Sequence, residues 1–138
     1  TYFYNVYGYK EISEGQYATL IGRFANLIKN NKPLTIVRPG TQKRNFTHIS
    51  DIIKGLHIVG ESGLGDGYGI GACEAFTIYE VAALFGGETF MLPPRAGNRK
   101  SAELITEKTL ELGWKAKYKL SDYIIKLQKN NWEHEPWI

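Results

Sequence analysis

Residues 45–59 read Asn-Phe-Thr-His-Ile-Ser-Asp-Ile-Ile-Lys-Gly-Leu-His-Ile-Val and place a short strand directly before a helix. Residues 45–48 are the strand candidate, since the segment is short and contains β-prone side chains. Either Ser50 or Asp51 can cap the helix that follows. The apolar side chains of that helix are Ile52, Ile53, Leu56, Ile58 and Val59.

Helices and short strands alternate along the rest of the chain. Apolar residues three and four positions apart predict a helix over residues 17–29, and the capping box formed by Thr77 and Glu80 starts another. Further helices are expected over residues 106–112 and 121–131, and further strands over residues 2–7, 34–37, 68–71 and 90–92. This alternation predicts an α/β or α+β fold with about five helices, in a single domain over residues 1–138.

The composition is typical of a soluble globular domain, with 43% hydrophobic and 22% charged residues among 138. The single cysteine, Cys73, excludes an internal disulfide and a multi-cysteine zinc site, and we interpret it as a small packed thiol. No apolar run approaches the ~18–20 residues that a membrane span needs. These features predict a cytoplasmic protein with no membrane partner.

The beginning of the chain is unusual for a complete domain. Residues 2–7, Tyr-Phe-Tyr-Asn-Val-Tyr, form an aromatic strand candidate with no polar segment before it. Such a strand needs neighbours on both sides, so we expect the chain to be the C-terminal part of a longer protein. Residues 2–7 and nearby apolar side chains are then expected to form an exposed patch or a new interface.

The charged residues point to a small anionic ligand. The net charge is +3, and the basic residues concentrate at residues 38–44 and 95–100, without the dense basic stripe of a nucleic-acid-binding protein. Arg44 and Arg95 lie in separate loops, and two guanidinium groups can hold a diphosphate between them. The competing interpretation is that both are solvated loop residues. The histidines lack metal-ligand spacing and no nucleophile motif is present, so we predict no metal and no catalytic residue.

Six segments, taken in order, resemble the motifs of one family. They are YFYNVYG (2–8), KPLTI (32–36), QKRNFTHISD (42–51), YGIG (68–71), PRAGN (94–98) and LGW (112–114). Together they resemble the C-terminal half of the extended short-chain dehydrogenases, the NAD-dependent epimerase/dehydratase family, and most of all enzymes of the UDP-glucose 4-epimerase type. The resemblance implies a small substrate-binding domain without the N-terminal Rossmann part.

The resemblance also implies roles for individual residues. Asn5 would contact the diphosphate or the sugar, and Arg44 and Arg95 would clamp the diphosphate. The residues implied for the base pocket and the ribose hydroxyls are Thr35, Ile36, Val37 and Asn98. Asn45 stands where the family commonly has an aspartate after the arginine, so the resemblance implies a weaker support of the arginine.

The hydride-transfer chemistry of that family would come from outside this chain, which has neither the Gly-x-x-Gly-x-x-Gly turn nor the Tyr-x-x-x-Lys pair. The resemblance therefore implies the nucleotide-sugar-binding half of an NAD-dependent epimerase or dehydratase. Its ligand would be a UDP-sugar, NAD would be held by the Rossmann half, and the full-length form would be a homodimer. No turnover is expected from this chain alone. Three alternatives stay open: a stand-alone nucleotide or sugar-phosphate-binding module, a subunit that pairs with a separately encoded Rossmann chain, and a weak nucleic-acid binder.

Overall fold

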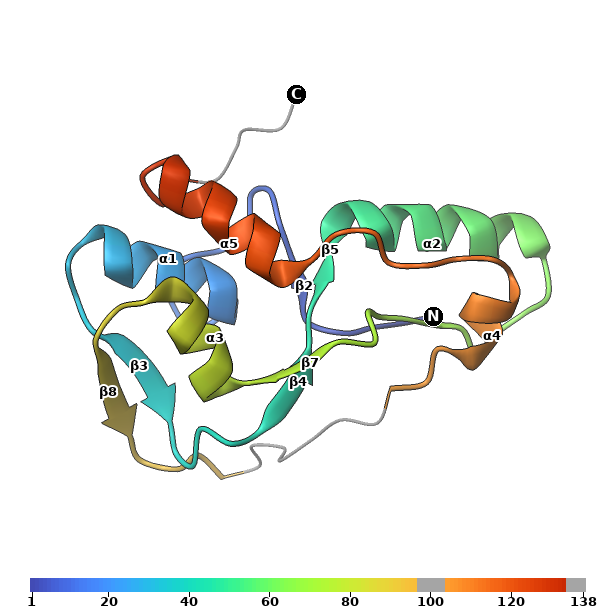
Figure 1. Ribbon diagram of the computed structural model, residues 1–138. Helices are drawn as coiled ribbons and strands as arrows, with labels where there is room; N and C mark the ends of the chain where they lie inside the picture. Colours follow the sequence, from blue (N-terminus) through green and yellow to red (C-terminus); the bar gives the residue numbers. More distant parts are fainter. Residues whose placement is uncertain (97–103, 134–138) are drawn as a thin grey trace.

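The computed structural model describes residues 1–96 and 104–133, and within them the chain forms five helices and eight short strands (Figure 1). The helices are α1 (Leu20–Lys29), α2 (Ile49–Ser62), α3 (Ile78–Phe85), α4 (Glu107–Glu111) and α5 (Leu120–Lys129). The strands are β1 (Tyr2–Phe3), β2 (Val6–Tyr7), β3 (Leu34–Val37), β4 (Lys43–Asn45), β5 (Thr47–His48), β6 (Gly69–Ile70), β7 (Ala75–Thr77) and β8 (Thr89–Leu92). The expected mixed class with five helices is confirmed. No helix within the described ranges combines the length and the apolar character needed to cross a bilayer.

The strands form four separate pairs. Three pairs are parallel, namely β1 with β6, β2 with β5 and β3 with β8, and β4 with β7 is antiparallel. Figure 1 shows β3 and β8 at one end of the molecule beside α1 and α3, and α2 and α4 at the other end. The strands from β4 to β7 and the N-terminal segment connect the two ends.

The main hydrophobic core joins α1, α3 and α5 to β3. The helices contribute Phe24, Val81 and Ile124, and β3 contributes Leu34 and Ile36, all of them buried. A second, smaller cluster lies beneath α2 and consists of Ile52, Ile70 and Trp114. The fold therefore has two packed regions, and residues of the segments between them, such as Tyr7 and Phe46, join the main core.

The helix caps explain where the helices begin and end. The Oγ1 of Thr19 accepts a hydrogen bond from the Gly22 N–H at 3.1 Å, so α1 starts three residues later than the apolar spacing predicts. Thr77 and Glu80 form the predicted capping box. The prediction that Ser50 or Asp51 caps α2 is wrong: the helix starts at Ile49, and the Nδ1 of His48 accepts the Ser50 N–H at 3.1 Å.

Asp51 lies in the first turn of α2 and connects that helix to the segment before α5. Its Oδ2 accepts hydrogen bonds from the backbone N–H groups of Lys117 and Tyr118, both at 3.0 Å. Its backbone carbonyl accepts the indole N–H of Trp114 at 2.9 Å. Since Asp51 is 1% exposed, this single residue fixes the position of the smaller cluster relative to the chain that leads into the last helix.

Three further sequence-based expectations differ from the structure. The strand expected over residues 45–48 is divided between the end of β4 and β5. The expected strand over residues 2–7 is divided into β1 and β2, because Asn5 has a φ of +38°, a conformation that asparagine tolerates better than most residues. Cys73 is exposed rather than packed. The strand β7 was not predicted, since its sequence Ala-Phe-Thr is too short to show alternation.

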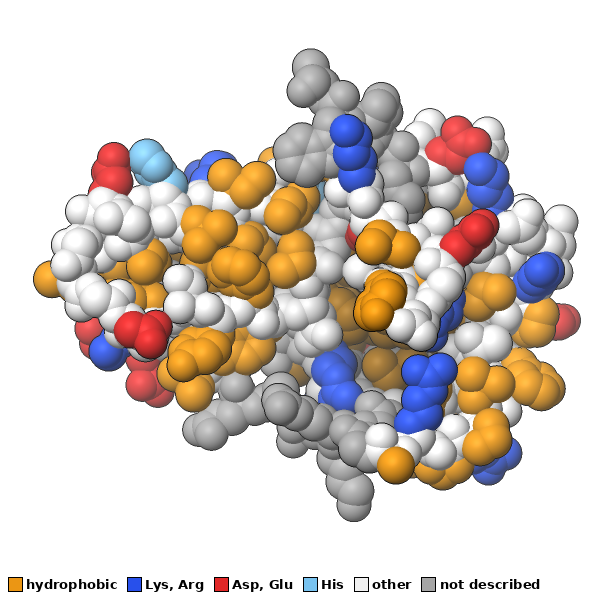
Figure 2. All heavy atoms as spheres, turned by 180° about the vertical axis from the view of Figure 1, so that it is seen from behind, with side chains coloured by type: hydrophobic (Ala, Val, Ile, Leu, Met, Phe, Trp, Pro, Cys, Tyr) orange, Lys and Arg blue, Asp and Glu red, His pale blue; other side chains and the backbone are white. Residues whose placement is uncertain are grey.

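The expected exposed apolar patch is present. Tyr2 and Phe3 of β1 are 56% and 50% exposed, and Ile53 and Leu56 of α2 are 49% and 40% exposed. Figure 2 shows a broad hydrophobic area over the part of the molecule that contains α2 and β1. Because β1 pairs only with β6, its other edge has no strand partner among the described residues.

The Asp51→Ala variant tests the polar connection between the two packed regions. We expect it to lower the free energy of unfolding by about 2–4 kcal/mol, because two backbone N–H groups lose a charged acceptor. Urea unfolding followed by circular dichroism measures the change. The exposed Glu111→Ala is the matched control and should change stability by less than ~0.5 kcal/mol. Equal stabilities of the two variants would contradict the structural role given to Asp51.

Candidate functional site

A pocket open to solvent lies between α1, β3 and β4. Its volume is about 170 Å³, and its lining residues are Asn5, Leu20, Arg23, Thr35, Val37, Gln42, Arg44, Phe46, Ile78 and Arg95. Figure 2 shows basic side chains at the border of a hollow with hydrophobic side chains inside it. None of these lining residues is acidic, so the pocket suits an anionic ligand with an apolar or aromatic part. We call it the arginine pocket.

The structure brings together five of the seven predicted site residues in the arginine pocket. They are Asn5, Thr35, Val37, Arg44 and Arg95. Ile36 does not line the pocket, because its side chain is 0% exposed and belongs to the main core. Successive side chains of a strand point to opposite faces, so Thr35 and Val37 can line the pocket only if Ile36 points away. Asn98 lies outside the described residues.

Asn5 reaches the arginine pocket at the kink between β1 and β2. Its Nδ2 donates to the backbone carbonyl of Asn45 at 3.1 Å, and its own carbonyl accepts the Thr47 N–H at 3.3 Å. These bonds hold the Asn5 side chain against the junction of β4 and β5. Asn5, the predicted ligand contact, is therefore held in place by hydrogen bonds within the protein.

Asn45, where the family resemblance implies an aspartate, uses its side chain as a hydrogen-bond donor. The buried Asn45 amide donates to the carbonyl of Ala72 at 3.0 Å, with longer contacts to the carbonyls of Cys73 and Glu74 at 3.3 Å. A carboxylate cannot donate these bonds. Asn45 thus connects β4 to the segment before β7, beside Arg44.

The two predicted arginines differ in their support. Arg44 is half-buried, and its guanidinium donates to the carbonyl of Lys43 at 2.9 Å. Arg95 is exposed and follows β8. Arg44 is more buried than Arg95, so its side chain loses less conformational entropy when it binds an anion. Arg44 is therefore the better pre-organised of the two anion contacts.

Five lining residues of the arginine pocket were not predicted from the sequence. Three are apolar, namely Leu20, Phe46 and Ile78, and two are polar, Arg23 and Gln42. Arg23 lies on α1 and is half-buried. Gln42 is 5% exposed, and its Nε2 donates to the carbonyl of Val37 at 3.1 Å. The apolar spacing of α1 places Arg23 off the core face, but the sequence alone does not show that this face meets β3.

Glu11 braces the loop that leads into α1. Its Oε2 accepts the Gly8 N–H at 2.6 Å, and its Oε1 accepts the Thr19 hydroxyl at 3.0 Å. Burial raises the pKa of Glu11 from 4.5 to about 7, although both hydrogen bonds favour the charged form. The position of the first turn of α1, where Leu20 lines the pocket, therefore depends on a carboxyl group that titrates near neutrality.

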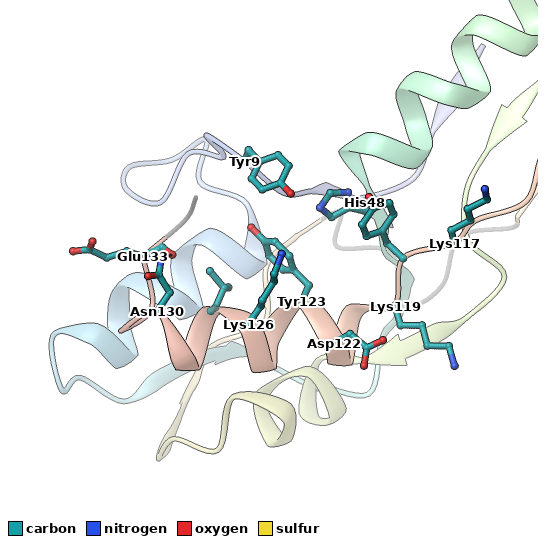
Figure 3. Close-up of a pocket in the computed structure, with 11 residues that line it drawn as sticks. Tyr9, His48, Lys117, Lys119, Asp122, Tyr123, Lys126, Asn130 and Glu133 are labelled. Atoms are coloured by element: carbon teal, nitrogen blue, oxygen red, sulfur yellow. Dashed lines mark hydrogen bonds between the residues drawn. The ribbon is translucent and has the colours of Figure 1, made fainter. Parts of the chain in front are cut away.

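A second pocket, of about 160 Å³, lies between the segment before α1 and helix α5 (Figure 3). His48 is central to it: its ring stacks on Tyr118 with centroids 4.3 Å apart and meets Tyr9 and Tyr123 edge-on. Burial lowers the pKa of His48, which keeps the ring neutral so that Nδ1 can accept the Ser50 N–H. None of the predicted site residues lines this pocket.

The described residues do not form a dinucleotide cradle of the kind used by Rossmann folds, which place a glycine turn between a strand and the N-terminus of a helix. Gly63, Gly65 and Gly67 do have positive φ angles. They follow the C-terminus of α2 and precede β6, which is the wrong end of a helix for binding a pyrophosphate. The residues present therefore do not fit NAD.

Comparison with known proteins assigns the class. Residues 2–71, about half of the chain, match the model of the NAD dependent epimerase/dehydratase family, and the chain belongs to this family.

Particular relatives are similar over part of the chain. The dTDP-D-glucose 4,6-dehydratase of Dictyostelium discoideum is 38% identical over 68 residues, which are 49% of this chain and 15% of that protein. A protein described as an uncharacterized UDP-glucose epimerase, YtcB of Bacillus subtilis, is 34% identical over 89 residues, which are 59% of this chain and 25% of that protein. The solved UDP-glucose 4-epimerase of Thermotoga maritima with UDP-glucose superposes with a TM-score of 0.81 at 22% identity, covering 95% of this chain and 45% of that one. The chain thus spans less than half the length of these relatives, and the last comparison shows the fold.

The titration of Glu11 predicts a pH dependence of stability. Below pH 4.5 the carboxyl is protonated in the folded and unfolded chains, and as the pH rises to about 7 the unfolded chain ionises first. The Glu11 contribution to stability is therefore lost between those values. We expect Glu11→Gln to gain, relative to the unmutated protein, as much as about 3 kcal/mol between pH 4.5 and pH 8.

Urea unfolding at a series of pH values measures this effect. Glu14→Gln is the control, since Glu14 is exposed in the same loop, and its stability should follow that of the unmutated protein at every pH. A parallel pH profile for Glu11→Gln and Glu14→Gln would rule out the buried titration.

Proposed function

We propose that residues 1–138 are the nucleotide-sugar-binding part of an NAD-dependent epimerase or dehydratase, and that the arginine pocket holds the nucleoside diphosphate. The observation that carries this proposal is the convergence of separate segments on the pocket. Asn5, Arg44 and Arg95 come from three places in the chain and meet beside a wall formed by Thr35 and Val37.

The chemistry of the arginine pocket matches the parts of a nucleotide sugar. The diphosphate carries two negative charges, which the guanidinium groups of Arg44 and Arg95 can neutralise with directed hydrogen bonds. The base needs an apolar surface, and Leu20, Val37 and Phe46 provide one. Asn5 adds an amide at the edge of the pocket for the sugar or the diphosphate.

NAD, when bound to such an enzyme, accepts a hydride from the sugar and returns it. Since the described residues do not fit NAD, the proposal places it on a Rossmann half that is not in this sequence. The open edge of β1 and the exposed face of α2 support that placement, because Tyr2, Phe3, Ile53 and Leu56 offer an apolar surface to a further layer. The task of this chain is then to bind and orient the substrate.

Calorimetric titration of the 138-residue chain with UDP-glucose tests the binding proposal. We expect saturable binding, and a 10- to 100-fold loss of affinity in Arg44→Ala, as for a lost charge-assisted contact worth about 1.5–3 kcal/mol.

Arg38→Ala is the matched control, because Arg38 is exposed and does not line the pocket. Its affinity should equal that of the unmutated chain. No binding at millimolar UDP-glucose, or equal losses in both variants, would overturn the proposed site.

The chain should not turn over a nucleotide sugar by itself, since no Tyr-x-x-x-Lys pair is present in the sequence. Incubation with NAD and UDP-glucose should give neither UDP-galactose nor a 4-keto sugar by NMR. Product formation that scales with the concentration of this chain would contradict the proposal that this chain only binds the substrate and that a Rossmann half supplies the chemistry.

A further inference from the structure

His48 offers an unused hydrogen-bond donor to the second pocket, the one between the segment before α1 and helix α5. Its Nδ1 accepts the Ser50 N–H at 3.1 Å, so the proton of the neutral ring lies on Nε2. Nε2 has no hydrogen-bond partner among the described residues, and it is not one of their fully buried unpartnered atoms. A side chain that is only 1% exposed therefore keeps a donor at the surface of the pocket that it lines. A buried polar group without a partner is unusual, and a ligand in the pocket would supply the acceptor.

The walls of the second pocket are aromatic. The rings of Tyr9, Tyr118 and Tyr123 surround that of His48, with centroid separations of 5.4, 4.3 and 5.5 Å. Leu127 of α5 adds an apolar side chain. The volume of the pocket is about 160 Å³, and a cavity of about 150 Å³ in another protein holds one benzene molecule. The second pocket therefore has room for a single six-membered ring that packs against aromatic faces and edges.

A positive charge lies beside the Nε2 donor. Lys126 lines the pocket from α5, and Figure 3 shows its side chain and those of Tyr9 and Tyr123 directed toward the space beside His48. Burial lowers the pKa of His48 most, and Lys126 lowers it as well, against the opposing charge of Asp51. A negatively charged acceptor in the pocket would match both the N–H of His48 and the ammonium group of Lys126.

The acidic residues near the second pocket are directed elsewhere. Glu133 pairs with Lys29 at 2.8 Å, and Figure 3 shows the carboxylate of Asp122 pointing away from His48. Asp51 does not line the pocket, and its Oδ2 accepts the two backbone N–H groups before α5. The part of the pocket next to His48 is thus suited to an anion.

We propose that the second pocket binds a small aromatic carboxylate. Its single six-membered ring would lie among the tyrosines, and its carboxylate would accept the Nε2–H of His48 beside the ammonium group of Lys126. An inorganic anion would leave the aromatic walls without a ligand contact, and a neutral ring would gain nothing from the charge of Lys126. No residue that lines this pocket also lines the arginine pocket, so the inference goes beyond the proposed function and does not depend on it.

Titration of the 138-residue chain with benzoate, followed by NMR of the histidine rings, tests the inference. A proton–nitrogen correlation spectrum reports Nε2 of His48 directly. We expect its resonance to shift and to saturate with a Kd of about 1 mM or less. Benzamide has the same shape without the charge, and cyclohexanecarboxylate has the charge without the aromatic ring. Each should bind more weakly than benzoate by about fivefold or more.

Four variants locate the site. Lys126→Met removes the charge from α5 and should lower the affinity for benzoate by about fivefold or more. Lys129→Met is the matched control, because Lys129 is exposed on the same helix and does not line the pocket. Tyr9→Leu should weaken benzoate more than cyclohexanecarboxylate, since it removes an aromatic wall. Arg44→Ala should leave benzoate binding unchanged, because Arg44 belongs to the arginine pocket. Methionine is a good helix former, and circular dichroism checks that α5 is retained.

Several results would overturn the inference. One is the absence of a saturable shift of the His48 Nε2 resonance at about 10 mM benzoate, and another is an equal loss of affinity in Lys126→Met and Lys129→Met. Benzamide binding as tightly as benzoate would refute recognition of the charge, and cyclohexanecarboxylate binding as tightly would refute recognition of the aromatic ring. A loss of binding in Arg44→Ala but not in Lys126→Met would place benzoate in the arginine pocket instead.

Discussion

The buried carboxylate of Asp51 is the contact on which the arrangement of this fold depends. Asp51 holds α2 to Trp114 of the smaller cluster, and through the backbone N–H groups of Lys117 and Tyr118 it holds α2 to the segment that leads into α5. Because its partners are mostly backbone groups, the contact constrains the path of the chain more than the identity of the neighbouring side chains. The segment that Asp51 holds leads directly into α5, whose apolar side chains pack in the main core with α1 and α3, and it carries Tyr118, which stacks on His48 in the second pocket.

The arginine pocket shows how a charged site can be assembled from weakly connected segments. Asn5 and Asn45 use their side-chain amides to fasten the N-terminal segment, β4 and the chain before β7 to one another. Amides suit this task better than carboxylates, since each must donate to carbonyl groups. Arg44 then lies on a fixed strand, and no acidic side chain among the lining residues competes with an anionic ligand.

Local patterns in the sequence predicted most of the elements, and failed where a nonlocal partner decides the structure. The spacing of the apolar residues in α1 and the capping box of Thr77 and Glu80 at the start of α3 are local signals, and both helices are present. The division of residues 2–7 occurs at Asn5, which bonds to Asn45 and Thr47 far along the chain, and the ring of His48, which caps α2 locally, is packed against the distant Tyr118 and Tyr123. Ile36 was assigned to the site with its neighbours by family resemblance, although strand alternation alone separates it from Thr35 and Val37. Arg23 was missed because the sequence predicts the helix α1 but does not show that α1 packs beside β3.

The parallel pairing of the N-terminal segment has a consequence for biosynthesis. Tyr2 pairs with Gly69, and Val6 pairs with Thr47, so residues 2–7 find their partners only after more than forty further residues have been made. At translation rates of roughly 5–20 residues per second, these aromatic residues wait for seconds without their native contacts. During that interval the unpaired edge of this β-prone segment is open to pairing with the wrong strand.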